Sequence, residues 1–336
     1  MNILFLGPQK STFVKNDFEI LSKYNKIIPV DTNVGGGIRG AFNLLKCTLK
    51  SIKGLLKSDL VFVWFADYSS LIPVLFAKIL GKKSVVVAGG FDVGYLPELN
   101  YGAKARAIRW FCVKNTFKYA KQILPVSNYA MKSLIALTGV NPKKVDMLYN
   151  CIKSSNYNLE ISDNSKRQHF ITVSQAGDLL EFVRKGNDRF IETAKQNPKF
   201  KFVLAGLRGS ALDKAIELGV HLDNLEIIPG PISLYNDILP LYSKAFGYFQ
   251  LSIEETFGLA VIEAMKCGCV PIVSPNAALP EVAGKHGVIV QTDEEIRRAL
   301  NNAIKIDIDK RFEFSVFADK YDIANREIKI MELLNK

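Results

Sequence analysis

The stretch that decides the fold is "SIEETFGLAVIEAMKCGCVPIVSPNAALPEVAG", residues Ser252 to Gly284. Seven residues separate Glu255 from Glu263, and Gly258 lies between them, where a loop is expected to become a helix. The first amides of a helix have no intrahelical acceptor and carry the positive end of its dipole, so a phosphate fits there. The spacing therefore predicts a nucleotide diphosphate at this helix start. The candidate donor contacts are Phe257, Gly258 and Leu259.

The two glutamates have different expected roles. Glu255 precedes the helix, where it can accept hydrogen bonds from hydroxyl groups of the donor sugar. Glu263 lies among apolar residues, and a buried carboxylate needs donors, which a ribose diol supplies. The alternative for either glutamate alone is structural: a satisfied core carboxylate at Glu263 and a surface residue complementing the helix dipole at Glu255.

The whole stretch resembles the E-x7-E signature of the retaining, family-four glycosyltransferases, also called glycosyl transferases group 1. The resemblance covers about residues 170 to 290 and is only architectural before that. It implies an α/β protein of the GT-B fold, in which two Rossmann-like domains face a central cleft. It also implies a UDP-, GDP- or ADP-sugar donor on the second domain, with no metal ion and no other cofactor.

A basic-glycine turn upstream strengthens this resemblance. "RKGNDRFIETA", from Arg184, implies that Lys185 binds the donor phosphates and that Arg184 helps it. The family often places an arginine directly after the preceding strand, where this chain has Ser174 and Gln175, so the identity of a second cation stays open. "LEIIPGPIS" implies that the turn at Gly230 and Pro231 lies near the base.

The resemblance also implies how transfer proceeds. Many relatives carry a His-Gly pair where this chain has Gly89 and Gly90 in "VVAGGFD", so we expect no histidine base. In a retaining front-face reaction the departing diphosphate accepts the acceptor's proton. Stabilisation of that diphosphate would come from Lys185, Arg184 and the amides near Gly258, with Glu255 as the third catalytic residue. Gly90 and Asp92 are candidate acceptor contacts, and the alternative for Asp92 is a turn residue after a strand.

Alternating short apolar runs and helical patterns predict two α/β domains. Residues 1–150 form the predicted acceptor-binding domain, beginning with "MNILFLG", whose Gly7 faces the crevice as a candidate donor contact. Polar residues predict a linker over 151–166, and residues 167–313 form the predicted donor domain. The resemblance implies that a last helix, 314–336, packs back on the first domain. The runs expected as strands are 26–30, 60–65, 84–90, 122–127, 169–174, 201–206, 225–230, 245–252, 270–274 and 287–291.

Composition separates the two halves. The chain has 336 residues, 48% of them hydrophobic, and a net charge of +11. Residues 1–150 contain 21 basic and 8 acidic side chains, a net charge of +13, whereas the remainder contains 23 and 25. This asymmetry predicts that the first half meets an anionic surface. No nucleic-acid reading motif is present, so a membrane surface is favoured over nucleic acid.

Two basic segments suggest how such a surface would be met. In the predicted helix 41–57 one stripe is basic and the neighbouring stripe is apolar. The segment 103–121 mixes cations with aromatic side chains, as at a membrane interface. The alternative is an ordinary crossover helix with apolar residues on the sheet and lysines in water. The helix 41–57 stripes are Lys46, Lys50, Lys53, Lys57 and Leu45, Leu49, Ile52, Leu56.

Several patterns argue against other classes of protein. No apolar run approaches the roughly 20 residues that span a bilayer, and no leader opens the chain, so we expect a cytoplasmic protein that is at most peripheral on the inner membrane face. Five cysteines without a C-x-x-C pair fit reduced thiols, and three histidines disfavour a metal site. "DID" at 307–309 predicts a solvated charge cluster, and Gly268 between Cys267 and Cys269 predicts a helix C-cap.

One glycine motif imitates a dinucleotide-binding turn. Gly35, Gly37 and Gly40 satisfy G-x-G-x-x-G, but they follow the second predicted strand, and the acid expected at the end of the next strand is missing there. We therefore expect Gly35, Gly36 and Gly37 to form an acceptor loop at a helix N-terminus, with a flexible surface turn as the alternative.

These observations predict a retaining hexosyltransferase that moves a sugar from a nucleotide-diphosphate sugar to a glycan or lipid-linked acceptor in cell-envelope polysaccharide synthesis. Two alternatives stay open. One is a nucleotide-sugar epimerase or hydrolase of the same fold, and the other is an inactive donor-binding or membrane-docking subunit.

Overall fold

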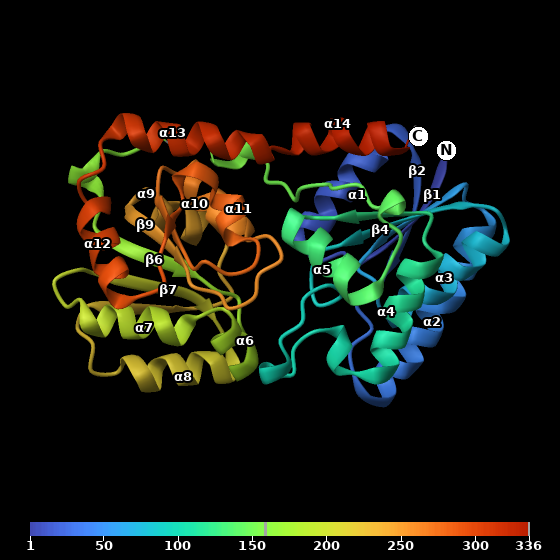
Figure 1. The fold of residues 1–336 in the computed structure, drawn as a ribbon, viewed down its shortest axis with the longest axis horizontal. Helices are drawn as coiled ribbons and strands as arrows, with labels where there is room; N and C mark the ends of the chain where they lie inside the picture. Colours follow the sequence, from blue (N-terminus) through green and yellow to red (C-terminus); the bar gives the residue numbers. More distant parts are fainter. Residues whose placement is uncertain (158–159, 335–336) are drawn as a thin grey trace. The chain divides into compact units, whose positions relative to one another are not determined.

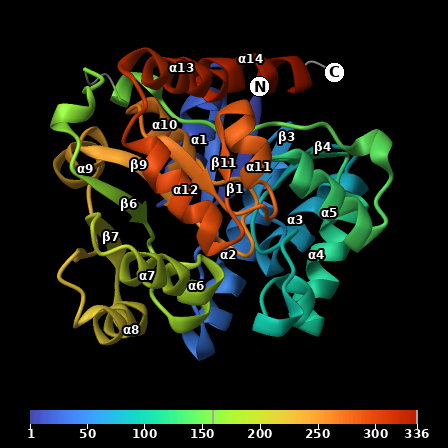
Figure 2. The same ribbon diagram turned by 60° about the vertical axis from the view of Figure 1, so that its left-hand side comes forward.

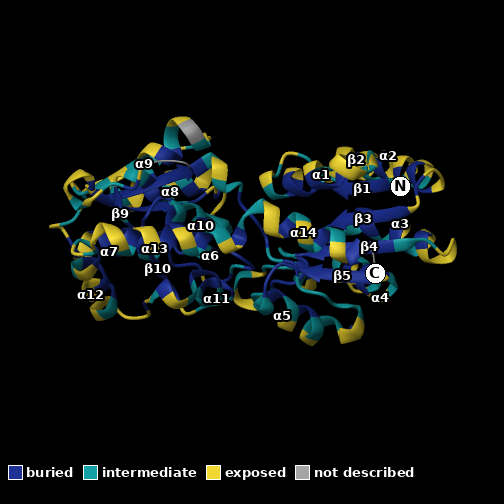
Figure 3. Cartoon of the chain, turned by 90° about the horizontal axis from the view of Figure 1, so that it is seen from above, coloured by how far each residue is buried: buried dark blue, intermediate teal, exposed yellow. Residues whose placement is uncertain are grey.

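The computed structural model describes residues 1–157 and 160–334 of the chain, which fold as two compact units (Figure 1). Unit 1 comprises Met1–Cys151 and, among the described residues, the helix that starts at Ile323; unit 2 is Ile152–Asp322. Each unit has one parallel sheet with helices packed against it, so the predicted α/β class is confirmed. In both sheets the central strands are buried, whereas three of the four edge strands are partly exposed (Figure 3).

Unit 1 is built on five parallel strands in the order β2-β1-β3-β4-β5. Four of the strands are short, buried apolar runs, as expected for a parallel sheet with both faces covered, whereas the edge strand β2 is partly exposed. The strands are β1 (Asn2–Gly7), β2 (Lys26–Asp31), β3 (Leu60–Trp64), β4 (Lys83–Ala88) and β5 (Gln122–Pro125). The helices are α1 (Thr12–Tyr24), α2 (Gly37–Leu56), α3 (Tyr68–Ile79), α4 (Ala107–Tyr119), α5 (Asn128–Thr138) and α14 (Ile323–Leu334), with 3-10 turns at Pro97–Leu99, Ala103–Ala105 and Pro142–Lys144.

Unit 2 has six parallel strands in the order β11-β10-β9-β6-β7-β8. Helices α7 and α8 pack together beside β6 and β7 (Figure 2). The strands are β6 (His169–Val173), β7 (Phe202–Leu207), β8 (Leu225–Pro229), β9 (Ala245–Gln250), β10 (Val270–Val273) and β11 (Val288–Ile289). The helices are α6 (Leu179–Arg184), α7 (Asn187–Gln196), α8 (Gly209–Gly219), α9 (Leu239–Ser243), α10 (Leu259–Lys266), α11 (Leu279–Ala283), α12 (Asp293–Ala303) and α13 (Ile308–Ala318). Shorter turns lie at Ser154–Tyr157, Asn164–Lys166, Leu234–Ile238, Gly284–His286 and Asp319–Tyr321.

Two predicted helices are interrupted. The helix expected over 103–121 begins as a 3-10 turn and continues as α4 after Arg106, whose backbone is extended (φ −129°, ψ 109°). The last helix, expected over 314–336, is instead α13, a 3-10 turn and α14. Its break falls at Asp322, which is extended (φ −67°, ψ 149°) because its carboxylate accepts a hydrogen bond from the Ser154 amide. Within the predicted segment 314–336, helix α14 belongs to unit 1, residues 314–322 belong to unit 2, and residues 335–336 lie outside the described part of the chain.

The segment expected as a linker over 151–166 is mostly part of unit 2. Cys151 is the last residue of unit 1, and the Ile152 amide already donates to the Tyr321 carbonyl in unit 2. Two 3-10 turns follow, and residues 158–159 lie outside the described part of the chain. Among the described residues no helix is both long and apolar enough to cross a membrane.

Candidate active site

The predicted donor residues of unit 2 gather at the carboxyl edge of its sheet. Glu255 and Gly258 follow β9, Gly230 follows β8, and Lys185 ends the helix that follows β6. Ligands of open parallel sheets bind outside the carboxyl ends of the strands, so this edge is where a nucleotide is expected.

Helix α10 starts at this edge without a side-chain cap. Its N-cap is Gly258, whose left-handed backbone (φ +96°) favours glycine. A Cβ there would lie 2.9 Å from Leu279 Cδ2 and 3.7 Å from Glu255 Cγ, so the Glu255 side chain lies against the start of the helix. The Ala278 amide donates to the Glu255 carbonyl at 3.1 Å and fixes that residue's backbone. The arrangement places a carboxylate beside a helix N-terminus that a phosphate could cap.

Backbone contacts bring Lys185 close to the segment that precedes Glu255. Gly186 has φ +69°, and a Cβ on it would lie 2.2 Å from the Leu251 carbonyl oxygen. The Ile253 amide donates to the Arg184 carbonyl at 2.8 Å. Within residues 1–157 and 160–334 the Lys185 ammonium and the Glu255 carboxylate have no ion-pair or hydrogen-bond partner. Both groups are therefore available to a ligand.

Arg184 is engaged by the protein itself. Its guanidinium donates to the Glu181 carboxylate through Nε at 3.2 Å and Nη2 at 2.6 Å, and through Nη1 to the Glu254 carbonyl at 2.6 Å. The Arg184 side chain is only 8% exposed. In this structure Arg184 connects α6 to the segment before Glu255, a role that the motif "RKG" did not reveal.

The remaining residues of the motif divide between surface and core. The Glu263 carboxylate is half-buried; burial raises its pKa, and a hydrogen bond with the Tyr157 side chain opposes that rise. The Phe257 ring is buried and packs edge-to-face on Tyr321, with ring centroids 5.5 Å apart. Only the Phe257 backbone can therefore contact a donor, whereas Leu259, the first residue of α10, is half-buried.

A cation that sequence reasoning missed lies on the same edge. Arg208 directly follows β7, is exposed, and has no partner for its guanidinium in the described part of the chain. Its Cγ would lie 3.2 Å from a Cβ on Gly230, so it covers the turn at Gly230 and Pro231. That turn packs on β7, since the same Cβ would lie 2.5 Å from the Gly206 carbonyl oxygen. The sequence signal that could have identified Arg208 is a basic residue directly after an apolar strand.

In unit 1, Gly7 and Gly90 permit close packing at the carboxyl edge. A Cβ on Gly7 would lie 2.9 Å from Val14 Cγ1, and one on Gly90 would lie 3.0 Å from the Phe65 ring. Phe65 itself has φ +66°, a left-handed backbone that is strained for a phenylalanine. Strain of this kind is common beside functional sites, and the acceptor and donor contacts expected of these glycines stay predictions.

Asp92 is placed differently from its predicted role. The side chain is 1% exposed and accepts hydrogen bonds from the backbone amides of Ala66 at 3.1 Å, Gly90 at 2.9 Å and Gly89 at 3.3 Å. Burial raises the pKa of this carboxyl to about 6, although the three amides oppose the shift. Asp92 thus holds the Gly89–Asp92 loop on β3, because its carboxylate is enclosed and occupied by those amides.

Gly35, Gly36 and Gly37 form an open loop that leads into α2. Gly35 and Gly37 have positive φ angles of +72° and +65°, and no atom lies within 4 Å of a Cβ on any of the three. The helix starts at Gly37 without a side-chain cap, so its predicted glycine-rich N-terminus is confirmed. Acceptor binding by this loop stays a prediction.

The motifs at residues 307–309 and 267–269 have structural roles. Residues 307–309 are exposed, and Asp307 caps α13 by accepting a hydrogen bond from the Lys310 amide at 2.8 Å. Cys267 and Cys269 are buried thiols. Gly268 has φ +75° at the end of α10, as expected for a helix terminus. Among the described residues no group of three or more His, Cys, Asp or Glu side chains could hold a metal ion.

Comparison with known proteins agrees with this geometry. Residues 163–319 match the model of the family described as glycosyl transferases group 1. The chain is 28% identical over 223 residues to O-antigen chain mannosyltransferase RfbU of Salmonella typhimurium, covering 64% of this chain and 60% of that protein. It is 24% identical to the phosphatidylinositol N-acetylglucosaminyltransferase gpi3 subunit of Schizosaccharomyces pombe, covering 66% of this chain and 50% of that protein. The matched region thus spans about half to three fifths of these relatives.

Solved structures establish the architecture. The crystal structure of HepE from Anabaena in complex with UDP and glucose superposes with a TM-score of 0.77 at 16% identity, and the match covers 100% of both chains. At this identity the likeness concerns the fold. The chain therefore has the GT-B fold, and its second unit is a domain of the glycosyl transferases group 1 family.

Proposed function

We propose that this protein transfers a sugar from a nucleotide-diphosphate sugar to a glycan or lipid-linked acceptor, with retention of the anomeric configuration. The observation that carries the proposal is the meeting of Lys185, Glu255 and the uncapped start of α10 at one edge of unit 2, with both side chains unpartnered in the described residues. Such groups match the charges of a diphosphate and the hydroxyls of a sugar.

In the proposed reaction Lys185 and the first amides of α10 bind the diphosphate and stabilise the charge that grows on it as the glycosidic bond breaks. Glu255 accepts hydrogen bonds from sugar hydroxyls and holds the anomeric carbon in place. The departing phosphate oxygen takes the acceptor's proton, so the reaction needs no protein base. The Glu263 carboxylate, oriented by Tyr157, binds the ribose, and the Gly230 turn lies beside the base.

We propose further that the acceptor is carried on a lipid and that the protein works at the cytoplasmic face of a membrane. The named relatives support this class of acceptor, since one is an O-antigen chain mannosyltransferase and the other is a subunit of a phosphatidylinositol N-acetylglucosaminyltransferase. The acceptor would be held by unit 1, where Gly7, Gly90 and the loop Gly35–Gly37 lie at the carboxyl edge of the sheet.

The donor class can be tested without knowing the acceptor. UDP, GDP and ADP, each with and without a sugar, are added to the protein and the melting temperature is recorded. A ligand at about 100 times its Kd adds about 2.7 kcal/mol to the stability, so one base should raise the melting temperature by several degrees and the others should not. Equal or absent shifts with all three would contradict a nucleotide-sugar site.

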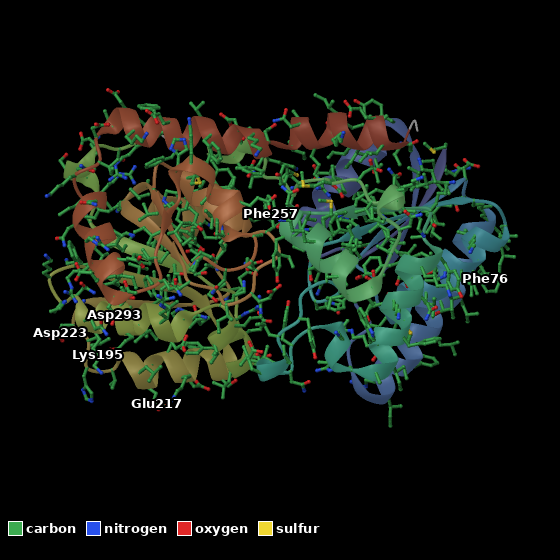
Figure 4. The ribbon with its side chains drawn as sticks, viewed as in Figure 1. Phe76, Lys195, Glu217, Asp223, Phe257 and Asp293 are labelled. Atoms are coloured by element: carbon green, nitrogen blue, oxygen red, sulfur yellow. The ribbon has the colours of Figure 1, made fainter. Side chains whose placement is uncertain are left out.

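Transfer is then measured with the radiolabelled sugar nucleotide of that base and a total lipid extract. Glu255→Gln and Lys185→Met should each lower label transfer a hundredfold or more, the usual cost of removing a group that stabilises developing charge. Lys195→Met and Glu217→Gln are matched controls, because both residues lie on the outer helices α7 and α8 (Figure 4). Near-normal transfer by either site variant would refute the assignment.

The two alternatives give different products. An epimerase or hydrolase would consume the donor in the absence of any lipid, which chromatography of the nucleotide sugar detects. An inactive binding subunit would show the selective thermal shift and no turnover with any lipid pool.

A further inference from the structure

Helix α2 packs on its sheet mainly with small residues and with Leu55, and turns most of its other large apolar residues outward. Cys47, Ser51 and Gly54 are buried, and a Cβ on Gly54 would lie 2.7 Å from Leu4 Cδ1, so the helix lies very close to β1. The opposite side carries a continuous stripe at helical spacing. The exposed fractions are 93% for Ile38, 56% for Phe42, 56% for Leu45, 52% for Leu49 and 67% for Leu56.

Two neighbouring helices extend this surface. Helix α3 packs against both α2 and α4 in the same layer (Figure 1). On α3, Phe76 is 40% and Ile79 is 68% exposed, and Phe76 points away from the unit (Figure 4). On α4, Ile108 is 74% and Phe111 is 63% exposed. We call the exposed apolar side chains of α2, α3 and α4 the docking face.

The charged side chains on the three helices of the docking face have one sign. None of the helices α2, α3 and α4 contains an aspartate or a glutamate. Lys46, Lys50 and Lys53 are exposed beside the α2 stripe, and the Lys46 ammonium lies 4.4 Å from the centroid of the Phe42 ring. Helices on the outer side of unit 2, such as α7, α8 and α12, mix both signs.

We propose that the docking face binds an anionic phospholipid bilayer, with the apolar stripe of α2 in the interface and the lysines at the headgroups. A large exposed apolar patch indicates a binding surface, and its cations select the partner. A second copy of the chain would bring like charges together, and nucleic acid would leave the aliphatic stripe in water. A bilayer with anionic headgroups satisfies both the stripe and the lysines, as for interfacial amphipathic helices.

Membrane binding by the docking face can be tested separately from sugar transfer, because binding to lipid can be measured with no donor present. The intact protein is sedimented with vesicles of phosphatidylcholine alone and with vesicles of equal parts phosphatidylcholine and phosphatidylglycerol. We expect binding to the anionic vesicles only. Replacing Lys46, Lys50 and Lys53 together with glutamine should weaken it about a hundredfold, since each charge near an anionic surface contributes about fivefold.

The apolar contribution is tested with a matched pair of double variants. Leu45→Glu with Leu49→Glu places charges in the stripe and should abolish vesicle binding. Phe312→Glu with Val316→Glu changes two apolar residues on α13, 48% and 68% exposed, and should leave binding unchanged. Circular dichroism checks that all variants fold, which is expected because every substituted side chain is exposed.

Three outcomes would overturn the proposal. The first is no binding to anionic vesicles, and the second is equal loss in the two double variants. The third is a change of oligomeric state on Leu45→Glu with Leu49→Glu, measured by light scattering without lipid, which would mean that a second copy covers the face. Failure of the nucleotide shift or of label transfer would instead count against the proposed function and leave vesicle binding intact.

Discussion

A buried ion pair is predicted to hold the C-terminal helix on unit 1. Arg326 on α14 and Asp17 on α1 are joined by two contacts, from Nε to Oδ1 at 2.5 Å and from Nη2 to Oδ2 at 2.7 Å. The side chains are 1% and 0% exposed. The Trp64 indole N–H donates to the same carboxylate at 2.8 Å, and Arg326 Nη1 donates to the Leu148 carbonyl at 3.1 Å.

Replacing Arg326 with methionine keeps the bulk and removes the charge, so the Asp17 carboxylate stays buried with the Trp64 donor as its remaining side-chain partner. Breaking a buried ion pair in this way lowers the free energy of unfolding by about 3–5 kcal/mol. Unit 1 falls in the size range where 1 kcal/mol shifts Tm by about 2–4 °C, so its transition should fall by about 6–20 °C. Replacing both partners with apolar residues, Arg326→Met with Asp17→Leu, should recover part of the loss, since no charge is then stranded.

The same two helices provide the control. Lys23 on α1 and Glu327 on α14 form an ion pair at 2.5 Å, but their side chains are 54% and 17% exposed. Lys23→Met should lower the free energy of unfolding by only about 0–1 kcal/mol, because water screens an exposed ion pair. Urea unfolding, followed by tryptophan fluorescence and circular dichroism, measures both variants. The reasoning is refuted if Arg326→Met costs no more than Lys23→Met.

Three further predictions concern buried titratable groups and the α6 contact. The pKa of Asp92 rises to about 6 on folding, so the free energy of unfolding of unit 1 should fall by roughly 3 kcal/mol as pH rises from about 4 through 6. Urea titrations at several pH values measure this fall, and Asp92→Asn should remove it. Burial lowers the pKa of His169 to about 4, so the free energy of unfolding of unit 2 should fall by roughly 3 kcal/mol as pH falls from about 6.5 through 4. His169→Gln should remove this pH dependence. Glu181→Gln weakens the hold on Arg184 and should lower kcat about tenfold with nucleotide Kd unchanged by calorimetry, whereas equal losses in both would contradict a positioning role.

Much of the fold could be predicted because its signals are local. The apolar runs of both sheets are consecutive residues, and each becomes a strand. The breaks at Arg106 and Asp322 could not be predicted in the same way. At Asp322 the break depends on a hydrogen bond to Ser154, a residue 168 positions away, and no local pattern announces it.

The direction of α2 was left open by the sequence for a related reason. Helical periodicity identifies a basic stripe and an apolar stripe, but it does not show whether the apolar stripe packs on the sheet or faces outward. Most of the buried positions of the helix hold small residues, among them Cys47, Ser51 and Gly54, and a Cβ on Gly54 would already lie 2.7 Å from Leu4 Cδ1 of β1. Large apolar residues are usually the ones buried, so small residues at the buried positions are the informative signal.

In the candidate site, too, backbone positions could be predicted from the sequence and side-chain directions could not. The sequence placed Gly258 correctly at the point where a loop becomes a helix, because a left-handed backbone admits few other residues. The direction of the Arg184 side chain could not be predicted, because a cation beside a glycine turn can point to a ligand or back to the protein, and here it contacts Glu181 and the Glu254 carbonyl. In the proposed function the glycines therefore set where a diphosphate can approach the chain. The cation that meets it must be identified from partners, and by that criterion Lys185 is available and Arg184 is not.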